Sequence, residues 1–432
     1  TFKLLMGSAA IKHQHMRKLD VKNAFVQADV VDRNIYMQQP HGYELEGDAG
    51  EALVCKLNKY LYGLVQSSRE FNELLEKTLT KELKFTQSVK DTCLYTIDSE
   101  YGPINIAAYV DDIVIASPNL DLITRIQKAL HKHFPVTIEP LTQVLGIEVE
   151  YDQEKGKIYF HQSNAIKTLA EAYQCDQVKP TSSPMEHGWH PDLYPNDIEK
   201  VKEYPFREAL GSIGYITSRT RPDAQHAAAR LQREMHDPTY SLVIAIERLL
   251  KYMFTTRYYR IGCTKEIDQK DPLRVYTDGN WGGWDKNVDH TFRSTIGAIS
   301  MLHDLPISWH SLLVKGKPLA SSAESEYVAV YAGITEGLSL QILLHEMKYI
   351  KRKDPLPTYV DSTACMAMCK NPVNYKRNKQ VMCKFHWNRE ALKRKEIRLI
   401  KVDTTENLSD VMTKVIKTIK HFTELIKNFM IT

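Results

Sequence analysis

Two adjacent aspartates, Asp111 and Asp112, stand between apolar runs rich in β-branched residues, in the stretch NIAAYVDDIVIAS (residues 105–117). Each run has the length and composition of a β-strand, so we expect the pair at the tip of a β-hairpin. Neighbouring carboxylates repel each other, and a divalent cation relieves that repulsion because hard cations take oxygen ligands. A plain surface turn is the alternative, since aspartate is common in turns.

A third carboxylate, Asp20, lies at the edge of an apolar segment whose residues 19–21 have the character of a strand end. Two strands that each present an aspartate could supply the ligands of two metal ions. Nucleotidyl transfer uses two such ions, one at the attacking oxygen and one at the leaving phosphate. Asp20, Asp111 and Asp112 are therefore the first candidate site.

A second group of acids follows predicted strands or begins a helix. Three of them come after the strands expected at 273–276, 357–360 and 397–402, and one lies near the start of a long helix expected at 321–346. These acids are Asp278, Asp361, Asp410 and Glu324. A fold that brings these ends together would make a four-carboxylate pocket for two metal ions, although each acid alone would more commonly be solvated.

The elements that must position these acids mix strands and helices, which predicts an α+β fold. Residues 1–11 have a helical pattern, and Ser67 with Glu70 has capping-box spacing ahead of an amphipathic helix. A proline-rich linker is expected at 180–205, followed by a mostly helical segment at 206–254 in which Pro222 suits a helix start. From residue 273 onward the pattern is three strands, a helix, a strand, a helix, a strand and a helix.

Composition narrows the class of protein. Over 432 residues, 43% are hydrophobic and 25% charged, as in ordinary globular proteins. No apolar run of membrane-spanning length and no secretory signal is expected, and seven scattered cysteines indicate a reducing compartment. Residues 371–401 hold ten Lys/Arg against two Glu, which indicates either a phosphate-binding segment or a solvated helix face.

Several long motifs resemble the reverse transcriptase of copia-type LTR retrotransposons. Residues 109–112 (YVDD) match its catalytic hairpin, and residues 19–44 (LDVKNAFVQADVVDRNIYMQQPHGYE) resemble its first catalytic motif. LYGLVQSSREFNE, LGIEVE and TRPD follow in the order of that family. The resemblance implies that Asp20 and Asp111 are metal ligands and that Asp112 supports the site.

The same resemblance assigns substrate contacts. Phe25 would lie beneath the sugar and exclude a 2′-OH, with a core aromatic as the alternative. Gln66 would contact the incoming nucleotide, with a turn or helix-cap role as the alternative. Tyr109 would touch the primer–template, with a packed strand tyrosine as the alternative.

YTDGNWGG, SSAESEY, VDSTACM and NLSDVMTK resemble the four acidic motifs of the RNase H domain in these elements. Asp278, Glu324, Asp361 and Asp410 would then be the ligands of its metal ions. Metal-activated water would attack an RNA phosphate with no covalent enzyme intermediate. Gln380 and Met382 stand where the family usually has a His and an Asp, and His386 is either a backbone contact or a satisfied helix histidine.

The resemblance implies a palm with partial fingers at 1–170, a thumb or connection at 171–265 and RNase H at 266–432. The implied ions are two Mg²⁺ per active site, replaceable by Mn²⁺. The implied ligands are an RNA template, a DNA primer, dNTPs and an RNA–DNA hybrid, and the implied partners are the capsid and integrase of the element, with no membrane. The location would be a cytoplasmic virus-like particle or the nucleus.

Two other interpretations stay open. In the family, further strands with basic residues that hold the triphosphate precede the point where this sequence starts. One alternative to polymerase turnover is therefore a nucleic-acid-binding remnant, and another is RNase H activity alone. Cys365, Cys369, Cys383 and His386 also have a spacing that could bind zinc, although the cysteines fit equally well as small core residues.

Overall fold

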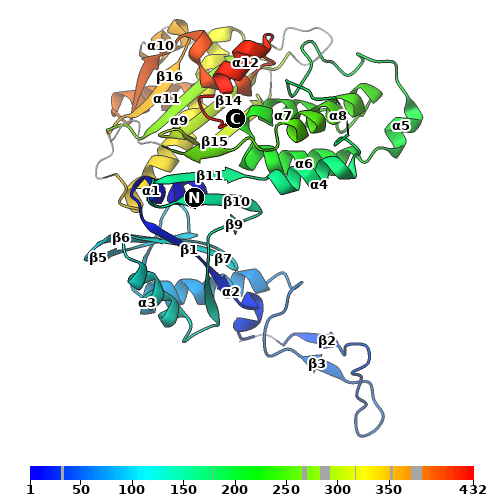
Figure 1. The fold of residues 1–432 in the computed structure, drawn as a ribbon, viewed down its shortest axis with the longest axis vertical. Helices are drawn as coiled ribbons and strands as arrows, with labels where there is room; N and C mark the ends of the chain where they lie inside the picture. The colour runs from blue at the N-terminus through cyan, green and yellow to red at the C-terminus, as the bar shows by residue number, and fades with distance from the viewer. Residues whose placement is uncertain are drawn as a thin grey trace. The chain divides into compact units, whose positions relative to one another are not determined.

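The computed structural model describes residues 1–30, 34–177, 179–264, 270–282, 292–316, 318–350, 354–370 and 382–432, with the backbone alone described at 382–386. The chain forms two compact units: unit 1 comprises Thr1–Leu5 and Gln14–Leu141, and unit 2 comprises Met6–His13 and Thr142–Thr432. Both units combine strands with helices (Figure 1), which confirms the predicted α+β class.

Unit 1 contains eight strands in its described part: β1 (His15–Val21), β2 (Tyr36–Gln38), β3 (Val54–Lys56), β4 (Thr86–Gln87), β5 (Leu94–Ser99), β6 (Gly102–Tyr109), β7 (Asp112–Ser117) and β8 (Val136–Glu139). Its helical segments are η1 (Ala24–Gln27), α2 (Ser67–Lys77), the π-helix η2 (Thr78–Glu82) and α3 (Leu120–Leu130). Helix α1 (Phe2–Ile11), predicted from the sequence, crosses the boundary between the units.

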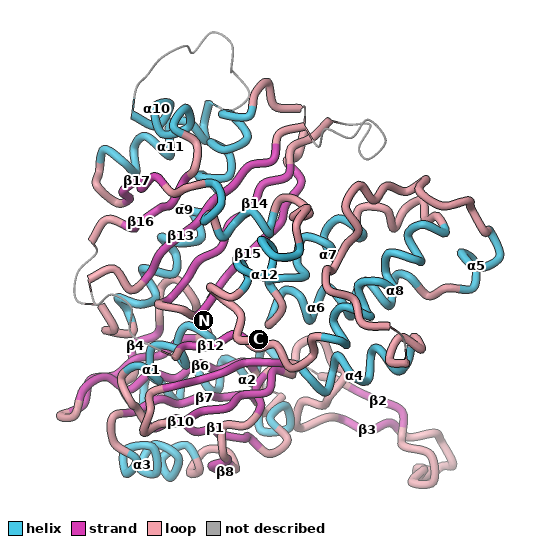
Figure 2. The backbone as a smooth tube through the Cα atoms, turned by 45° about the horizontal axis from the view of Figure 1, so that its top comes forward, coloured by secondary structure: helices cyan, strands magenta, loops and turns pink. Residues whose placement is uncertain are grey.

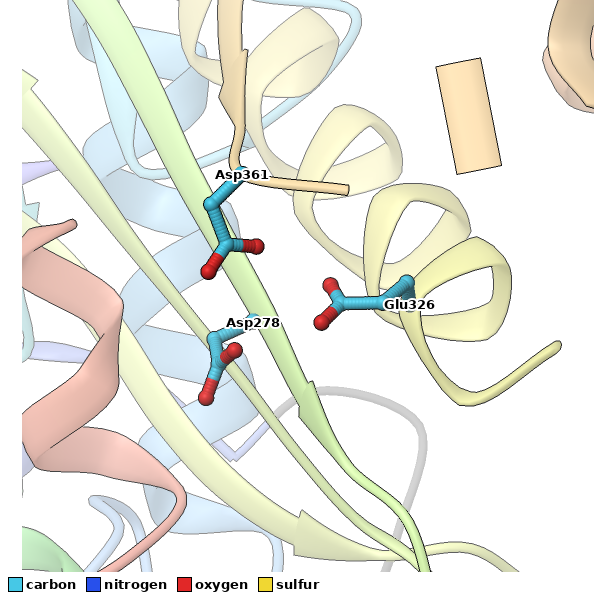
Figure 3. Close-up of side chains that lie close together, drawn as sticks. All are labelled: Asp278, Glu326 and Asp361. Atoms are coloured by element: carbon cyan, nitrogen blue, oxygen red, sulfur yellow. The ribbon is translucent and has the colours of Figure 1, made fainter. Parts of the chain in front are cut away.

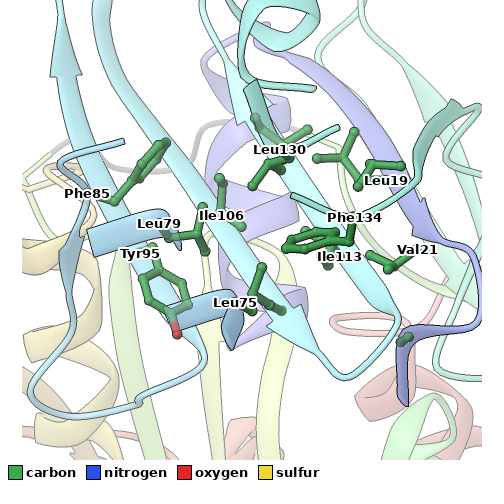
Figure 4. Close-up of a cluster of buried hydrophobic side chains, with 14 of the residues drawn as sticks. Leu19, Val21, Leu75, Leu79, Phe85, Tyr95, Ile106, Ile113, Leu130 and Phe134 are labelled. Carbon is green, nitrogen blue, oxygen red and sulfur yellow. The ribbon is translucent and has the colours of Figure 1, made fainter. Parts of the chain in front are cut away.

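Six of these strands form one sheet in the order β4-β5-β6-β7-β1-β8. Leu19, Ile106 and Ile113 from three neighbouring strands belong to one apolar cluster, with Leu75 of α2 and Leu130 of α3 packed among them (Figure 4). Burial of apolar surface fixes the strand register, because a slip of one residue would turn each apolar side chain to the other face.

Helix α2 confirms the predicted amphipathic helix, but the predicted capping box is wrong. Gln66 occupies the N-cap position and Ser67 is already helical. The Ser67 hydroxyl donates instead to the carbonyl oxygen of Leu61 at 2.5 Å. The hydroxyl therefore fixes the preceding turn and leaves the helix start without a side-chain cap.

The strands of unit 2 in its described part are β9 (Gln143–Val144), β10 (Ile147–Asp152), β11 (Lys157–His161), β12 (Ile261–Cys263), β13 (Leu273–Asn280), β14 (Thr295–Leu302), β15 (Leu305–Leu313), β16 (Leu356–Val360) and β17 (Ile397–Lys401). Its helices are α4 (Ser163–Ala172), α5 (Ile198–Glu203), α6 (Phe206–Arg219), α7 (Gln225–Gln232), α8 (Tyr240–Thr255), α9 (Ser322–Glu346), α10 (Thr363–Lys370), α11 (Met382–Lys393) and α12 (Ile419–Ile426). Short 3-10 turns are η3 (Pro222–Ala224), η5 (Thr404–Glu406) and η6 (Leu408–Met412).

Helices α6, α7 and α8 confirm the helical segment predicted at 206–254, and Pro222 opens η3 as predicted. Arg221 is fully buried, and two of its nitrogens lie 2.9 and 2.7 Å from the carboxylate of Asp223. The hydroxyl of Tyr252 donates to the same carboxylate at 2.7 Å. This buried pair ties the start of α7 to α8.

Five strands form the second large sheet, in the order β15-β14-β13-β16-β17. Strands β13, β14 and β15 pair antiparallel, whereas β13, β16 and β17 pair parallel. Helix α9 packs on β13, β14 and β16, and Figure 2 shows it beside the magenta strands. The predicted three strands, long helix and following strand from residue 273 onward are confirmed, but the described residues form two helices, α10 and α11, between β16 and β17, where the predicted succession has one.

Helix α9 corrects the expectation that no segment has membrane-spanning length and hydropathy. Its most apolar 18-residue window has a mean hydropathy of 1.4, which makes it, among the described residues, the one helix that could cross a membrane by length and composition. However, 61% of that window is buried in the protein. A core helix packed on a sheet passes the same test, so this is weak evidence for a membrane span.

Candidate active sites

Three carboxylates converge at one edge of the five-stranded sheet. Asp278 lies on β13, Asp361 directly follows β16 and Glu326 lies in the first turns of α9 (Figure 3). Because β13 and β16 run parallel with Thr277 opposite Val360, the two aspartates occupy neighbouring positions. One ligand oxygen from each of the three acids lies within 4.8 Å of the others.

Gly279 allows α9 to approach the sheet at this point. A Cβ atom at position 279 would lie 2.4 Å from the carbonyl carbon of Ser325 and 2.6 Å from the backbone nitrogen of Glu326. Any side chain would therefore push α9 away from β13. The glycine that follows Asp278 is what lets Glu326 reach it.

The structure corrects the predicted role of Glu324. Ser321 caps α9 by accepting a hydrogen bond from the backbone nitrogen of Glu324, and the Glu324 carboxylate accepts one from the backbone nitrogen of Ala320 at 2.8 Å. Each residue of an α-helix is rotated by about 100° from the one before it. The side chains of Glu324 and Glu326 therefore differ by about 200° in direction and point to different sides of α9. Ser321 and Glu324 have the spacing of a capping box, and that signal in the sequence identifies Glu324 as a capping residue.

Asp410 lies beside the three acids, on η6. The Asn407 side chain donates to the carbonyl oxygen of Thr277 at 3.0 Å, which fastens η6 to β13. Gly297 on β14 makes room for this turn, since a Cβ there would lie 2.5 Å from that of Met412. Asp410 is only 3% exposed, so its carboxyl group is held inside the site.

Lys414 and Thr413 are the cationic and hydroxyl groups of this site. The Lys414 ammonium lies 2.9 Å from a carboxylate oxygen of Asp410 and 3.8 Å from one of Asp278. The Thr413 hydroxyl donates to the Asp278 carboxylate. Both residues belong to the motif NLSDVMTK, in which only Asp410 was predicted to be a functional residue.

Burial and mutual repulsion disfavour the charged forms of these acids. Burial, together with the charges of Asp278 and Asp361, raises the pKa of Glu326 to about 10. Burial and Asp278 raise the pKa of Asp410 to about 7, with Lys414 acting in the opposite direction. Burial and Asp278 also raise the pKa of Asp361. The protein thus holds several acids at close range without enough positive charge to balance them.

The donor set fits a hard divalent cation. Within the described part of the chain, one carboxylate oxygen each of Glu326, Asp361 and Asp410 is buried without a hydrogen-bond partner. Buried polar atoms are normally paired, so such oxygens need an explanation. Oxygen donors converging from several carboxylates are the ligands that Mg²⁺ and Mn²⁺ prefer.

The first candidate site lies in unit 1. Asp20 on β1 is the direct cross-strand partner of Asp112 on β7, and the β6–β7 hairpin predicted around Asp111 is confirmed. Val110, the residue before Asp111, has a φ of 56°, the left-handed conformation that a tight turn requires. Topology therefore brings together the strand ends that carry all three predicted acids.

These three acids are less tightly gathered than those of unit 2. Among the described residues they do not form a group whose ligand oxygens all lie within 4.8 Å of one another. The Lys18 ammonium lies 2.8 Å from a carboxylate oxygen of Asp112. Burial acts to lower the pKa of Lys18, but Asp112 and then Asp20 outweigh it and raise that pKa. Lys18 therefore supplies the positive charge between the two strands.

The predicted substrate-contacting residues of unit 1 are partly or fully accessible. Tyr109 is 58% exposed at the end of β6, so the packed-strand alternative does not fit it. Gln66 is half-buried at the N-cap position of α2, and its side chain makes no capping hydrogen bond. The ring centre of Phe25 in η1 lies 4.6 Å from that of Tyr62, with the two rings tilted by 50°. Phe25 also packs at the margin of the apolar cluster, so it combines a core contact with partial exposure.

Comparison with known proteins finds relatives over most of the chain. The family model for reverse transcriptase (RNA-dependent DNA polymerase) matches residues 1–187. A retrovirus-related Pol polyprotein from transposon TNT 1-94 of Nicotiana tabacum is 29% identical over 424 residues, which cover 96% of this chain and 31% of the relative. The corresponding polyprotein from transposon RE1 of Arabidopsis thaliana is 32% identical over 416 residues, covering 96% of this chain and 27% of the relative.

The chain belongs to the copia-type retrotransposon Pol proteins. It spans less than a third of the length of these two relatives. A solved structure, the foamy viral protease–reverse transcriptase in complex with RNA/DNA hybrid, matches with a TM-score of 0.51 and 10% identity, over 95% of this chain and 47% of that chain. That likeness shows a shared fold.

In this copia-type chain the zinc hypothesis stays a prediction. Cys365 and Cys369 are buried on α10, and the hydrogen bond that the Cys365 thiol makes to Cys369, together with burial, raises the pKa of that thiol. The side chains of Cys383 and His386 lie outside the described residues, as do those of Gln380 and Met382.

Proposed function

We propose that unit 2 carries a ribonuclease H that hydrolyses the RNA strand of an RNA–DNA hybrid. The observation that carries this proposal is the convergence of Asp278, Glu326 and Asp361, with Asp410 beside them. These four carboxylates would hold two Mg²⁺ ions, or Mn²⁺ in their place. When bound, the ions would activate water and stabilise the charge that develops on the phosphate.

Residues of the chain itself would keep this site in order. The Thr413 hydroxyl would orient Asp278, and the Lys414 ammonium would balance the excess negative charge beside Asp410. The foamy viral protein of similar fold was solved with an RNA/DNA hybrid, which supports such a hybrid as the substrate. We assign this activity to residues 266–432.

Two glutamates that are two residues apart on α9 provide a matched test. Glu326→Gln removes one site carboxylate, and we expect hybrid cleavage to fall by more than the roughly 10–100-fold that loss of a supporting residue costs. Glu324→Gln changes the same functional group two residues away and should leave the cleavage rate unchanged, because Glu324 only caps α9. Initial rates on a labelled hybrid measure both. Equal losses in the two variants would overturn the assignment of Glu326.

We further propose that the chain also carries an RNA-directed DNA polymerase, with residues 1–170 as palm and partial fingers and residues 171–265 as thumb or connection. Its acids lie in unit 1, whereas residues 142–265 belong to unit 2. The pairing of Asp20 with Asp112 beside Asp111 supports it. These acids would hold two metal ions, while Phe25, Gln66 and Tyr109 would contact the sugar, the incoming dNTP and the primer–template. The template would be RNA or DNA.

Primer extension separates this proposal from the alternative of a nucleic-acid-binding remnant. The wild-type chain should extend a DNA primer on an RNA template, and Asp111→Asn should abolish extension without weakening primer–template binding. Binding without any extension by the wild type would favour the remnant, with RNase H as the only activity. We place the protein in a cytoplasmic virus-like particle or the nucleus, with the capsid and integrase of its element as partners.

A further inference from the structure

Lys18 lies among acids from three neighbouring strands of the unit 1 sheet. Leu19 belongs to the apolar cluster on one face of that sheet (Figure 4). Because side chains alternate along a strand, its neighbours on β1, Lys18 and Asp20, lie on the opposite face. Lys18 is directly opposite Glu139 on β8. Asp20 is directly opposite Asp112 on β7, so three acids share this face with Lys18.

The Lys18 ammonium is the counter-ion of this acidic face. It lies 2.8 Å from a carboxylate oxygen of Asp112, and the two side chains are only 21% and 23% exposed. The carboxylates of Asp20 and Glu139 attract the same ammonium. Salt screens a partly buried ion pair much less than an exposed one, so this contact is stronger than an ordinary surface salt bridge.

The three acids proposed for the polymerase site differ in what they already bind. Lys18 holds the carboxylate of Asp112. Among the described residues, the side chains of Asp20 and Asp111 have neither a hydrogen bond nor an ion pair. Carboxylate oxygens without a protein partner fit a hard divalent cation, which takes oxygen ligands. Two of the three acids are therefore open to a metal ion, and the third is engaged.

We propose that Lys18 is a positioning residue of the polymerase site, which holds Asp112 against β1 and keeps that carboxylate from binding a metal ion. Asp20 and Asp111 are then the direct ligands. This inference rests on the proposed polymerase function and narrows its metal ligands from three acids to two. The ammonium also relieves the repulsion between Asp20 and Asp112, which are directly opposite on neighbouring strands.

Competition between two cations gives the physical reason. An ammonium and a divalent ion on one carboxylate group lie close together and repel each other. Lys18 belongs to β1 and is always beside Asp112, whereas a metal ion must come from solution and lose part of its hydration. Mg²⁺ gives up water reluctantly, so it displaces a tethered ammonium poorly. Asp112 therefore stays with Lys18 when an ion binds at the other two acids.

Mn²⁺ binding tests this role directly. Lys18→Gln should tighten binding at the unit 1 site about tenfold, because Asp112 joins the ligands and a nearby positive charge is lost. Lys18→Arg keeps the charge and should bind Mn²⁺ as the wild type does. Lys128→Gln is the matched control, since Lys128 is exposed on α3, which packs on the apolar face of the same sheet. Titrations followed by electron paramagnetic resonance measure the affinity, with Asp278→Asn in every variant to hold the contribution of unit 2 constant.

A double-mutant cycle shows whether Lys18 acts through Asp112. In an Asp112→Asn background the ammonium has lost its partner, so Lys18→Gln should change the Mn²⁺ affinity by less than about twofold. A tightening that persists in this background would show that Lys18 acts only through its charge, and the proposal would be wrong. An Mn²⁺ affinity that Lys18→Gln leaves unchanged in the wild-type background would overturn it as well.

The metal-free chain gives a second readout. In EDTA, Lys18→Gln should lower the thermal unfolding midpoint, because Asp20 and Asp112 then face each other without a cation, and a further Asp112→Asn should restore it. An equal loss in Lys128→Gln would contradict the proposal. Neither measurement needs turnover. If the wild type extends no primer but the Mn²⁺ and thermal results are as expected, the proposed function fails and the role of Lys18 stands.

Discussion

Glu326, Asp361 and Asp410 are acids that the fold holds close together at a cost in free energy. Their raised pKa values mean that the folded chain binds more protons than the unfolded chain between about pH 4 and the folded pKa values. Stability is then lost as the pH rises through that range, the reverse of the behaviour of carboxylates whose pKa is lowered.

We therefore expect the metal-free protein to unfold at a lower temperature at pH 8 than at pH 5. The pKa of Asp410, about 7, lies inside this interval, and that of Glu326, about 10, lies above it, so both acids favour the lower pH. Thermal melts in EDTA measure the effect. Glu326→Gln should flatten the dependence, and Mg²⁺ should restore stability at pH 8 in the wild type. A rising midpoint between pH 5 and pH 8 in the wild type would contradict this account.

At the scale of elements, the acidic site depends on how closely α9 and η6 approach the sheet. Gly279 and Gly297 leave no room for a side chain against α9 and η6, respectively. Neither glycine has a positive φ. Each glycine instead leaves room for a neighbouring element to pack closely on the sheet. These elements, α9 and η6, carry Glu326 and Asp410, respectively.

Gly279→Ala should therefore destabilise the protein by about 1–3 kcal/mol, the usual cost of overpacking, and should reduce hybrid cleavage. Gly211→Ala is the matched control, because Gly211 is exposed on α6 with no atom within 4 Å of its ideal Cβ. A helical glycine-to-alanine change at an open position should stabilise by roughly 0.5–1 kcal/mol. Urea unfolding measures the free energy of unfolding of both variants. Similar changes in this free energy for the two variants would show that α9 can move away from β13 freely.

At the scale of the whole molecule, the two candidate sites belong to different compact units. Each unit has its own sheet and its own buried apolar residues. A substitution that removes one carboxylate in one unit should therefore act on one reaction alone.

Asp278→Asn is expected to abolish hybrid cleavage and to leave primer extension at its wild-type rate. Asp111→Asn is expected to abolish primer extension and to leave hybrid cleavage at its wild-type rate. Parallel assays on the same preparations measure both reactions. Loss of both activities in either variant would show that the sites depend on each other.

The sequence by itself determined much of this description. Alternating and helical patterns predicted the β6–β7 hairpin, α1, α2, α9 and most of the order of elements after residue 273, because apolar periodicity follows directly from which face is buried. The acids Asp20, Asp111, Asp112, Asp278, Asp361 and Asp410 were singled out by their places after strands. Their catalytic roles remain predictions.

Only the tertiary structure decided which glutamate faces the other acids. Glu324 and Glu326 are equivalent in type and lie in the same helix turn, so their distinction depends on how α9 docks against β13 at Gly279. Contacts between distant segments leave no periodic signal in a chain, since periodicity records only which side of an element is buried.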